Sequence, residues 1–389
     1  MPSDTNKKII VSYASAGGGH KAVAEAIKEA LIKLDPSVKI EVIDILNFTS
    51  KLFKFFYASG YLFLANRAKY LWGFLYSRKE DVSFVSESNK FSRLVMRILA
   101  RRFISYIKEI NPDAFIFTHF LPSKIVQDIK ERDKLQFKTG VVVTDYGNHS
   151  IWLTPGTDFY FVATEQLKIE MVHFLNRLKM RQENIIVSGI PVRMKFLEPI
   201  NREQVRDKLG LSIDCPVISF IMGIVGMRRI LEILKYLTSL EVDFQLILLV
   251  GKDEELKRKV KEYFKDKEFP YLRKILIYGM VGNMNEILSV SDLVITKSGG
   301  IITSETISMG APMVFIENYP GQEERNVDYF LEEGTGIKIN QLSSIKYKIE
   351  SLLKDRDRLK GMKENVEKIA KPAASLRIAE VILNEVKKC

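Results

Sequence analysis

Short apolar runs alternate along this chain with segments in which apolar and polar residues recur at helical spacing. In the first half the runs are almost uninterrupted by polar residues, which is typical of strands buried on both faces of a parallel sheet. These predicted strands are residues 8–13, 39–44, 114–118, 140–144, 159–163 and 184–187. The amphipathic segments between them predict helices, among them residues 21–34, 91–110, 121–133 and 164–177. The first half is therefore predicted to be a doubly wound α/β domain.

The same alternation starts again after residue 200. The predicted strands of this second series are residues 217–222, 245–250, 274–278, 293–296 and 313–316, with helices between them. The predicted fold class is therefore α/β, with two Rossmann-like, doubly wound domains. We place an N-terminal domain at residues 1–195 and a C-terminal domain at residues 196–371. A last helix within residues 372–389 is expected to pack back on the N-terminal domain.

The composition narrows the choice of partners. The chain has 389 residues and a net charge of +11, because 59 lysines and arginines outnumber 48 aspartates and glutamates. This excess favours an anionic partner, which is a nucleic acid, an anionic membrane surface or a phosphorylated substrate. The two cysteines lie far apart and suggest neither a zinc site nor a disulfide framework. We see no signal peptide and no stretch of about 18 apolar residues, so we expect a cytoplasmic protein, at most peripheral to a membrane.

Three glycines and a histidine follow the first predicted strand, in the sequence VSYASAGGGHKAVAEAI that begins at Val11. Glycines at a strand-to-helix junction let a ligand approach the backbone, and an open helix N-terminus attracts anions. The alternative is a tight turn that lets the helix pack closely. His20 favours a site, because a helix N-terminus lowers the pKa of an imidazole and a neutral imidazole suits a general base.

A second group of polar and glycine residues follows two predicted strands of the second half, between Ile295 and Ile337. An open helix start there offers N–H groups to a diphosphate, a carboxylate on the same helix suits two ribose hydroxyls, and a later amide and carboxylate suit a sugar. The alternative is a set of surface loops with helix caps. The residues in these three roles are Ser298, Gly299 and Gly300; Glu305; and Gln322 with Glu323.

The order of several motifs resembles one family of enzymes over nearly the whole chain. These motifs are SAGGGHKAVAEAI, TDYGNHSIW, SGIPVRMKF, GMVGNMNEIL, TKSGG followed by SE, and PGQEERN. Together they resemble glycosyltransferases of the GT-B architecture, in which two Rossmann-like domains face each other across a cleft. The chain is most similar to monogalactosyldiacylglycerol synthases and bacterial diacylglycerol glucosyltransferases, and more distantly to the peptidoglycan GlcNAc transferase.

The resemblance implies a role for each matching residue. In this family the histidine of the glycine loop is the base for the acceptor hydroxyl, which here is His20, and Asp145 would orient it. The implied acceptor-side residues are Gly18, Gly19, His149 and Trp152, and the implied donor-side residues are Gly223, Met280, Val281, Met284 and Arg193, beside those named above. Two departures put donor choice in doubt. The loop FIMGIVGMRR is poorer in glycine than in relatives, and Ile302 stands where relatives often have threonine.

Residues 47–79 form a stretch that has no acidic residue and mixes aromatic with basic side chains. This mixture suits the headgroup region of an anionic bilayer. The alternatives are a buried helix pair with basic ends at the surface and a nucleic-acid surface, of which the second is weak because no nucleic-acid module is present. The residues expected at the membrane are Lys51, Lys54, Phe55, Phe56, Tyr61 and Trp72.

These observations lead to one hypothesis and three alternatives. The hypothesis is an inverting glycosyltransferase that moves a hexose from UDP-glucose or UDP-galactose to the 3-hydroxyl of diacylglycerol at the cytosolic membrane face, with no nucleic-acid partner. UDP-sugar would be a co-substrate, and we expect no obligatory catalytic metal because no metal-binding D-x-D motif stands out. The alternatives are a UDP-GlcNAc transferase with a polyprenyl-linked acceptor, a UDP-GlcNAc 2-epimerase and a non-enzymatic lipid-binding module.

Overall fold

The computed structural model describes residues 7–15, 18–50, 54, 101–177, 184–223, 226–318 and 321–388. The chain divides into two compact units. The N-terminal unit comprises the described residues of Met1–Met194 with Tyr319–Arg325 and Lys371–Cys389, and the C-terminal unit comprises those of Lys195–Asn318 with Asn326–Ala370. Each unit is described by itself below.

The N-terminal unit contains a six-stranded parallel sheet in the order β2-β1-β3-β4-β5-β6. The strands are β1 (Lys8–Tyr13), β2 (Lys39–Asp44), β3 (Ala114–Phe117), β4 (Lys138–Val142), β5 (Phe159–Val162) and β6 (Ile185–Val187). The helices are α1 (Gly19–Leu34), α6 (Arg101–Ile110), α7 (Phe120–Asp133) and α8 (Glu165–Arg177), with 3-10 turns η1 (Ile45–Phe48) and η2 (Ser150–Trp152). The predicted strands are confirmed, with ends that move by at most two residues.

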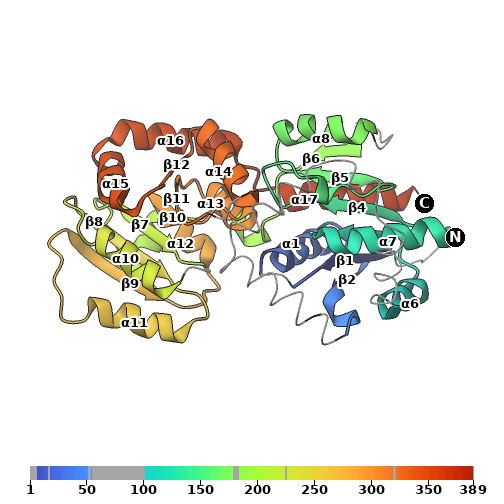
Figure 1. The fold of residues 1–389 in the computed structure, drawn as a ribbon, viewed down its shortest axis with the longest axis horizontal. Coiled ribbons are helices and arrows are strands. Elements are labelled where there is room, and N and C mark those ends of the chain that lie inside the picture. The colour runs from blue at the N-terminus through green and yellow to red at the C-terminus, as the bar shows by residue number, and fades with distance from the viewer. Residues whose placement is uncertain are drawn as a thin grey trace. The chain divides into compact units, whose positions relative to one another are not determined.

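Helix α1 illustrates how the spacing of apolar residues determines the helices of this unit. Its buried residues Val23, Ala26, Ile27, Ala30 and Leu31 recur at the spacing of one helix face. This face packs on β1 and β2 and on the last helix, α17 (Ala374–Lys387). Figure 1 shows α17, in red, among the blue and green elements of the N-terminal unit. The chain end therefore completes the core of the unit in which the chain begins.

The C-terminal unit contains a second six-stranded parallel sheet, in the order β12-β11-β10-β7-β8-β9. Its strands are β7 (Val217–Ile221), β8 (Phe244–Leu249), β9 (Leu272–Tyr278), β10 (Leu293–Thr296), β11 (Met313–Phe315) and β12 (Gly336–Lys338). Its helices are α9 (Arg202–Leu209), α10 (Met227–Leu237), α11 (Glu254–Phe264), α12 (Met284–Val290), α13 (Gly300–Ser308), α15 (Ile345–Lys354) and α16 (Arg356–Ile369), with turn η5 (Leu342–Ser344). Two elements lie across the division between the units, which are η4 (Met194–Phe196) and α14 (Gln322–Glu332).

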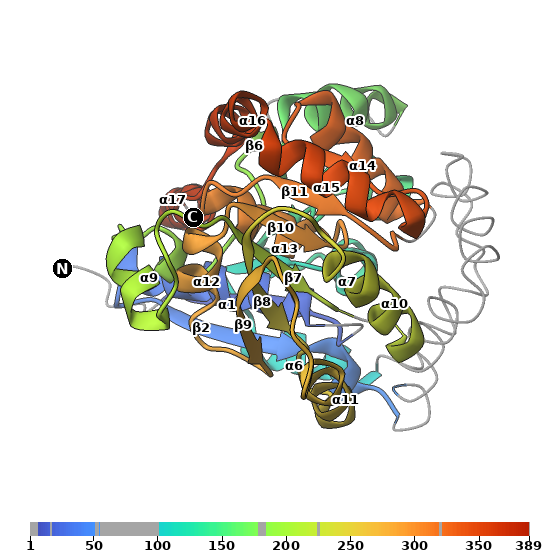
Figure 2. The same cartoon turned by 90° about the vertical axis from the view of Figure 1, so that its left-hand side faces the viewer.

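The core of the C-terminal unit lies on both faces of this sheet. Ile218, Phe220 and Met222 join a cluster with the apolar sides of α10, α11 and α15. Val217 belongs to a smaller cluster with residues of α9 and α12. Figure 2 shows α9 and α12 side by side, with α10 on the other side of β7 and β8. Alternate residues of β7 thus face opposite helix layers, which explains the continuous apolar run in the sequence.

Both sheets have a point at which the strand order reverses. In the N-terminal unit β1 lies between β2 and β3, and in the C-terminal unit β7 lies between β8 and β10. Ligands of open α/β sheets bind at such points, outside the carboxyl ends of the strands. The fold therefore directs attention to the loops after β1 and β3 and to those after β7 and β10. The predicted fold class of two Rossmann-like units is confirmed.

In the part of the chain that the structure describes, the helices lack the combination of length and apolar character that crossing a membrane requires.

Candidate active site

His20 lies at the start of α1, at the strand-order reversal of the N-terminal sheet. Its Nδ1 is 2.6 Å from the carbonyl oxygen of Thr118, the residue that follows β3. Because a carbonyl oxygen only accepts hydrogen bonds, Nδ1 carries the proton in the neutral ring and donates it. The hydroxyl of Thr118 in turn donates to the carbonyl oxygen of His20 at 2.9 Å. Thr118 therefore binds His20 through both its side chain and its main chain.

This tautomer leaves the lone pair of His20 on Nε2. Among the described residues, the hydrogen bonds of the ring go to Thr118 and, at 3.5 Å, to the hydroxyl of Thr144, and both involve Nδ1. Burial lowers the pKa of His20 to about 4, against the opposing effect of the Thr118 carbonyl, which raises it. The imidazole is consequently neutral at pH 7 and able to accept a proton at Nε2.

His20 and three neighbouring aromatic rings pack together. We call this group the ring cluster: His20, His119, Phe120 and Trp152. The His20 and His119 rings meet edge to face, with centroids 4.7 Å apart. His119 contacts Phe120 at 4.2 Å, Phe120 contacts Trp152 at 6.2 Å, and Trp152 lies 6.3 Å from His20. The four contacts form a closed circuit, so each ring limits the movement of its two neighbours.

The carboxylate of Asp145 is bonded to two other side chains, and its predicted role in orienting His20 stays a prediction. One oxygen of Asp145 accepts from Nε1 of Trp152 at 2.9 Å, and the other accepts from the side-chain amide of Gln322. None of the hydrogen bonds that His20 makes within the described residues goes to Asp145. Asp145 therefore holds the indole of the ring cluster, and the main chain after β3 holds the histidine.

Three further implied acceptor-side residues, His149, Gly18 and Gly19, are described by their main-chain contacts. His149 is buried, and its Nδ1 accepts from the N–H of Ile151, which caps η2. Gly18 is exposed and precedes α1 without a side-chain cap, so the N–H groups of Gly19 and the next residues lack a side-chain acceptor. The start of α1 is consequently a place where an anion or an oxygen atom can bind.

The loop between β10 and α13 is held from two sides. Both the N–H and the hydroxyl of Ser298 donate to the side-chain oxygen of Asn318, at 3.0 and 2.9 Å. The amide of Asn326 donates to the carbonyl oxygen of Ser298 at 2.8 Å. Ser298 is thus used inside the protein, contrary to the expectation that its N–H is free for a diphosphate. The donors left for a ligand are the first N–H groups of α13, because Gly299 gives that helix no side-chain cap.

The remaining donor-side residues are distributed around this loop. Lys297 is only 9% exposed, and its Cδ lies 4.0 Å from where a Cβ on Gly223 would be, so these two loops touch. Gly223 has a φ of +54°, a conformation that favours glycine. Glu305, on α13, and Glu323, in the first turn of α14, are partly exposed, and their predicted contacts to ribose and sugar stay predictions.

Arg193 is engaged elsewhere. Its Nε donates to Glu29 of α1 at 2.6 Å, and the N–H of Met194 donates to the other carboxylate oxygen at 3.1 Å. This pair fixes the end of the N-terminal unit to α1. This contact does not test the implied donor-side role of Arg193, which stays a prediction.

The stretch after β9 contains three of the implied donor-side residues, of which one is exposed and two are packed. Met280 is 67% exposed, whereas Val281 and Met284 pack against the smaller core cluster of the C-terminal unit. Lys195, which the sequence did not single out, donates to the carbonyl oxygen of Gly282 at 2.6 Å and anchors this loop.

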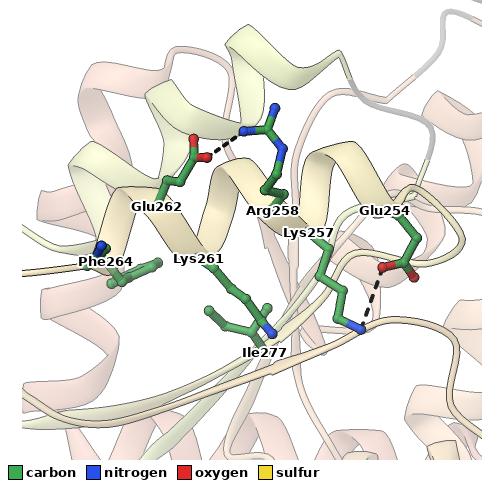
Figure 3. Close-up of a pocket in the computed structure, with 8 residues that line it drawn as sticks. Glu254, Lys257, Arg258, Lys261, Glu262, Phe264 and Ile277 are labelled. Carbon is green, nitrogen blue, oxygen red and sulfur yellow. Dashed lines mark hydrogen bonds and ion pairs between the residues drawn. The ribbon is translucent and has the colours of Figure 1, made fainter.

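A surface depression of about 600 Å³ lies between α11 and β9. Figure 3 shows its lining, in which Lys257 pairs with Glu254 and Arg258 with Glu262. One end adjoins the loop after β9, because a Cβ on Gly279 would lie 3.5 Å from Nζ of Lys257. Its two acidic side chains pair with two of its four basic side chains, which leaves the lining with a net positive charge. None of the predicted site residues belongs to this lining, so the depression is not the candidate site.

Two expectations concern the membrane and metal ions. Lys51, Phe55, Phe56, Tyr61 and Trp72 lie outside the described residues, and Lys54 donates to Asn47 at 2.6 Å. The D-x-D spacing does occur at Asp355 and Asp357, but Asp355 caps α16 by accepting from the N–H of Arg358. That spacing therefore has a structural explanation, and the absence of a catalytic metal stays a prediction.

Comparison with known proteins bears on the whole chain. A family model described as monogalactosyldiacylglycerol (MGDG) synthase matches residues 20–192, and one described as the glycosyltransferase family 28 C-terminal domain matches residues 226–378. A processive diacylglycerol beta-glucosyltransferase of Staphylococcus aureus is 30% identical over 339 residues, which are 85% of this chain and 81% of that protein. The chain belongs to the family of diacylglycerol glycosyltransferases. Another member with the same name, from Bacillus licheniformis, is 27% identical over 384 residues, 98% of this chain and 95% of that protein.

Solved structures agree with this family on the fold. MurG from Acinetobacter baumannii has a TM-score of 0.59 and 16% identity, with 97% of this chain and 99% of that chain covered. A UDP-GlcNAc 2-epimerase from Neisseria meningitidis has a TM-score of 0.57 and 14% identity, with 98% and 100% covered. At 16% and 14% identity these two structures show the fold alone. The assignment to the diacylglycerol glycosyltransferase family rests on the sequence relatives.

Proposed function

We propose that this protein transfers a hexose from UDP-glucose or UDP-galactose to the 3-hydroxyl of diacylglycerol at the cytoplasmic face of the cell membrane. The observation that carries the proposal is the match of nearly the whole chain to enzymes named processive diacylglycerol beta-glucosyltransferase. The neutral imidazole of His20, with its lone pair on Nε2, supplies a base of the kind that such a reaction needs.

In the proposed reaction, Nε2 of His20 accepts the proton of the diacylglycerol hydroxyl. The hydroxyl oxygen forms a bond to the anomeric carbon while the bond from that carbon to the diphosphate oxygen breaks, and UDP leaves. Attack from the side opposite the leaving group inverts the configuration, so an α-linked donor gives a β-glycoside. The carbonyl of Thr118 keeps its hydrogen bond to Nδ1 and stabilises the imidazolium that forms.

The donor would be bound by the C-terminal unit. The first N–H groups of α13 and the cationic side chain of Lys297 are the groups that would balance the charge of the leaving diphosphate. Glu305 would accept hydrogen bonds from ribose, and the loop after β9 would contact uracil. Ser298 and Asn318 would act by holding the β10–α13 loop in place.

The first test is a product assay with diacylglycerol in anionic vesicles and UDP-glucose, UDP-galactose or UDP-GlcNAc as donor, analysed by mass spectrometry. One hexose on diacylglycerol establishes the reaction and the donor, and further hexoses show that several sugars are added. His20→Ala is the matched variant, and we expect its turnover to fall about 10²- to 10⁴-fold while UDP binding stays. Retained turnover would remove His20 from the role of base.

Two further arms separate the alternatives. A polyprenyl-linked acceptor with UDP-GlcNAc tests the second transferase reaction, and UDP-GlcNAc without acceptor tests epimerisation at C2. The assay is run with and without EDTA, and we expect equal rates because no metal is expected to be obligatory. Lack of product with every donor and acceptor would overturn the proposal.

The membrane part of the proposal rests on the aromatic and basic stretch at residues 47–79 and on the net charge of +11. We expect binding to anionic vesicles that weakens at high salt, because screening reduces attraction between exposed charges. Uncharged vesicles of the same size are the control. Equal binding to both would show that anionic lipids are not the partner.

A further inference from the structure

A second histidine lies beside His20 in a matching arrangement. His119 is buried and precedes α7, and its Nδ1 accepts a hydrogen bond from the N–H of Leu121 at 3.1 Å. Because an N–H can only donate, the Nδ1 of His119 is unprotonated, and the ring proton lies on Nε2. The two neighbouring imidazoles therefore have opposite tautomers, with His20 protonated at Nδ1 and His119 at Nε2.

We propose that His119 is a positioning residue, whose ring holds the His20 imidazole in the one orientation that pairs Nδ1 with Thr118 and leaves the lone pair on Nε2. This inference rests on the proposed function, in which Nε2 of His20 accepts the proton of the acceptor hydroxyl. In this proposal His119 acts through His20.

The geometry gives the physical reason. A histidine ring can rotate by a half-turn and exchange the places of its nitrogen and carbon atoms. Within the ring cluster, the edge-to-face contact of His119 at 4.7 Å and the tilted contact of Trp152 at 6.3 Å limit that rotation. His119 is in turn fixed by its bond to Leu121 and by its contact with Phe120. The orientation of His20 is thus set by a packed wall as well as by one hydrogen bond.

The same arrangement leaves only one base in this pair. The lone pair of His119 on Nδ1 is occupied by the N–H of Leu121, so His119 does not compete for the acceptor proton. Burial lowers the pKa of His119 well below its usual range, and the charge that His20 acquires lowers it further. Protonation of His119 at Nδ1 would break its hydrogen bond to Leu121, whereas His20 keeps its hydrogen bond to Thr118 when Nε2 is protonated. In the described residues, the side chains that face His20 beside His119 are the uncharged Thr118, Thr144 and Trp152.

Two substitutions separate the ring of His119 from its role as a helix cap. His119→Asn keeps a side-chain oxygen that caps α7 and removes the ring. His119→Phe keeps a ring and removes the cap. His173→Asn, at an exposed position on α8, is the control. The readouts are kcat and KM for the donor, the melting temperature, and the imidazole ¹⁵N spectrum, which the chain makes simple because it has only four histidines.

We expect His119→Asn to lower kcat at least tenfold with an unchanged KM, and to turn the single Nδ1–H signal of His20 into a mixture. We expect His119→Phe to melt at a lower temperature yet to keep kcat within about threefold of the wild type. Wild-type kcat and a wild-type His20 spectrum in His119→Asn would overturn the proposal, and so would equal losses in both variants. The spectrum needs no substrate, so it tests the positioning role independently of the transfer reaction. If only the proposed function fails, the protein has no transferase activity, but the His20 tautomer still changes in His119→Asn as expected.

Discussion

Replacement of His20 by asparagine is expected to change how the free energy of unfolding depends on pH. In the folded protein burial lowers the pKa of His20 to about 4, whereas an unfolded chain has an ordinary histidine pKa of about 6.5. Below pH 6.5 the unfolded chain therefore binds a proton that the folded protein binds only near pH 4. Stability from this group is present above pH 6.5 and is lost as the pH falls toward 4.

The size of the effect follows from these two pKa values. Between pH 7 and pH 4.5 the histidine costs the folded state about 2.5 kcal/mol, and asparagine costs it nothing because it does not titrate. The difference in unfolding free energy between wild type and His20→Asn should therefore shift by about that amount in favour of the variant at pH 4.5. Urea unfolding at both values measures it, and His173→Asn is the control for an exposed histidine. The same difference at both pH values would show that His20 is not desolvated, and the reasoning from burial would fail.

Three further predictions concern the contacts of the candidate site. Glu305→Gln should weaken UDP binding by about 1–3 kcal/mol in calorimetry, as expected for hydrogen bonds to a charged group, and unchanged affinity would separate Glu305 from the ribose. Asn318→Ala removes the acceptor of both Ser298 donors, so UDP binding should weaken while the circular dichroism spectrum stays the same. Unchanged UDP binding would mean that the β10–α13 loop keeps its shape without the Asn318 side chain. Trp152→Phe removes the indole donor to Asp145 and should lower the unfolding free energy by about 1.5–3 kcal/mol, measured by urea unfolding with Trp72 as the remaining tryptophan. An unchanged unfolding free energy would show that the carboxylate finds another partner.

The strands could be predicted because a parallel sheet covered on both faces requires apolar residues at every position. Runs such as residues 8–13 and 293–296 have the same limits in the structure as in the sequence. β12 (Gly336–Lys338) was missed, because three residues with one apolar side chain form no run. Its place is set by pairing with β11, which the local sequence does not reveal.

The site residues also divide into those that the local sequence reveals and those that it does not. His20 could be recognised from its own neighbourhood, a strand followed by glycines and a helix. Its partner could not, because Thr118 is 98 residues away and reaches His20 only through the pairing of β1 with β3. The family resemblance implies that Asp145 orients His20, whereas its carboxylate accepts hydrogen bonds from Trp152 and Gln322. The usable signal was position, since the predicted strand 114–118 ends at Thr118, and His119 follows it at the edge where His20 lies.

A base whose pKa is about 4 in the free protein must become stronger when the substrates bind, and this gives a last prediction. In the proposed reaction the diphosphate lies beside the anomeric carbon that the acceptor oxygen attacks, so its negative charge favours the protonated form of His20. One such charge at about 6 Å, with an effective dielectric constant near 20, contributes about 2.8 kcal/mol and raises the pKa by about 2. The acidic limb of kcat/KM, which reports the free protein, should then lie near pH 4, and that of kcat, which reports the complex, near pH 6. Coincident limbs would mean either that the donor phosphate does not approach His20 or that another group is the base. His20→Ala distinguishes these two explanations. If His20 is the base and the phosphate stays distant, the variant loses turnover; if another group is the base, it keeps turnover.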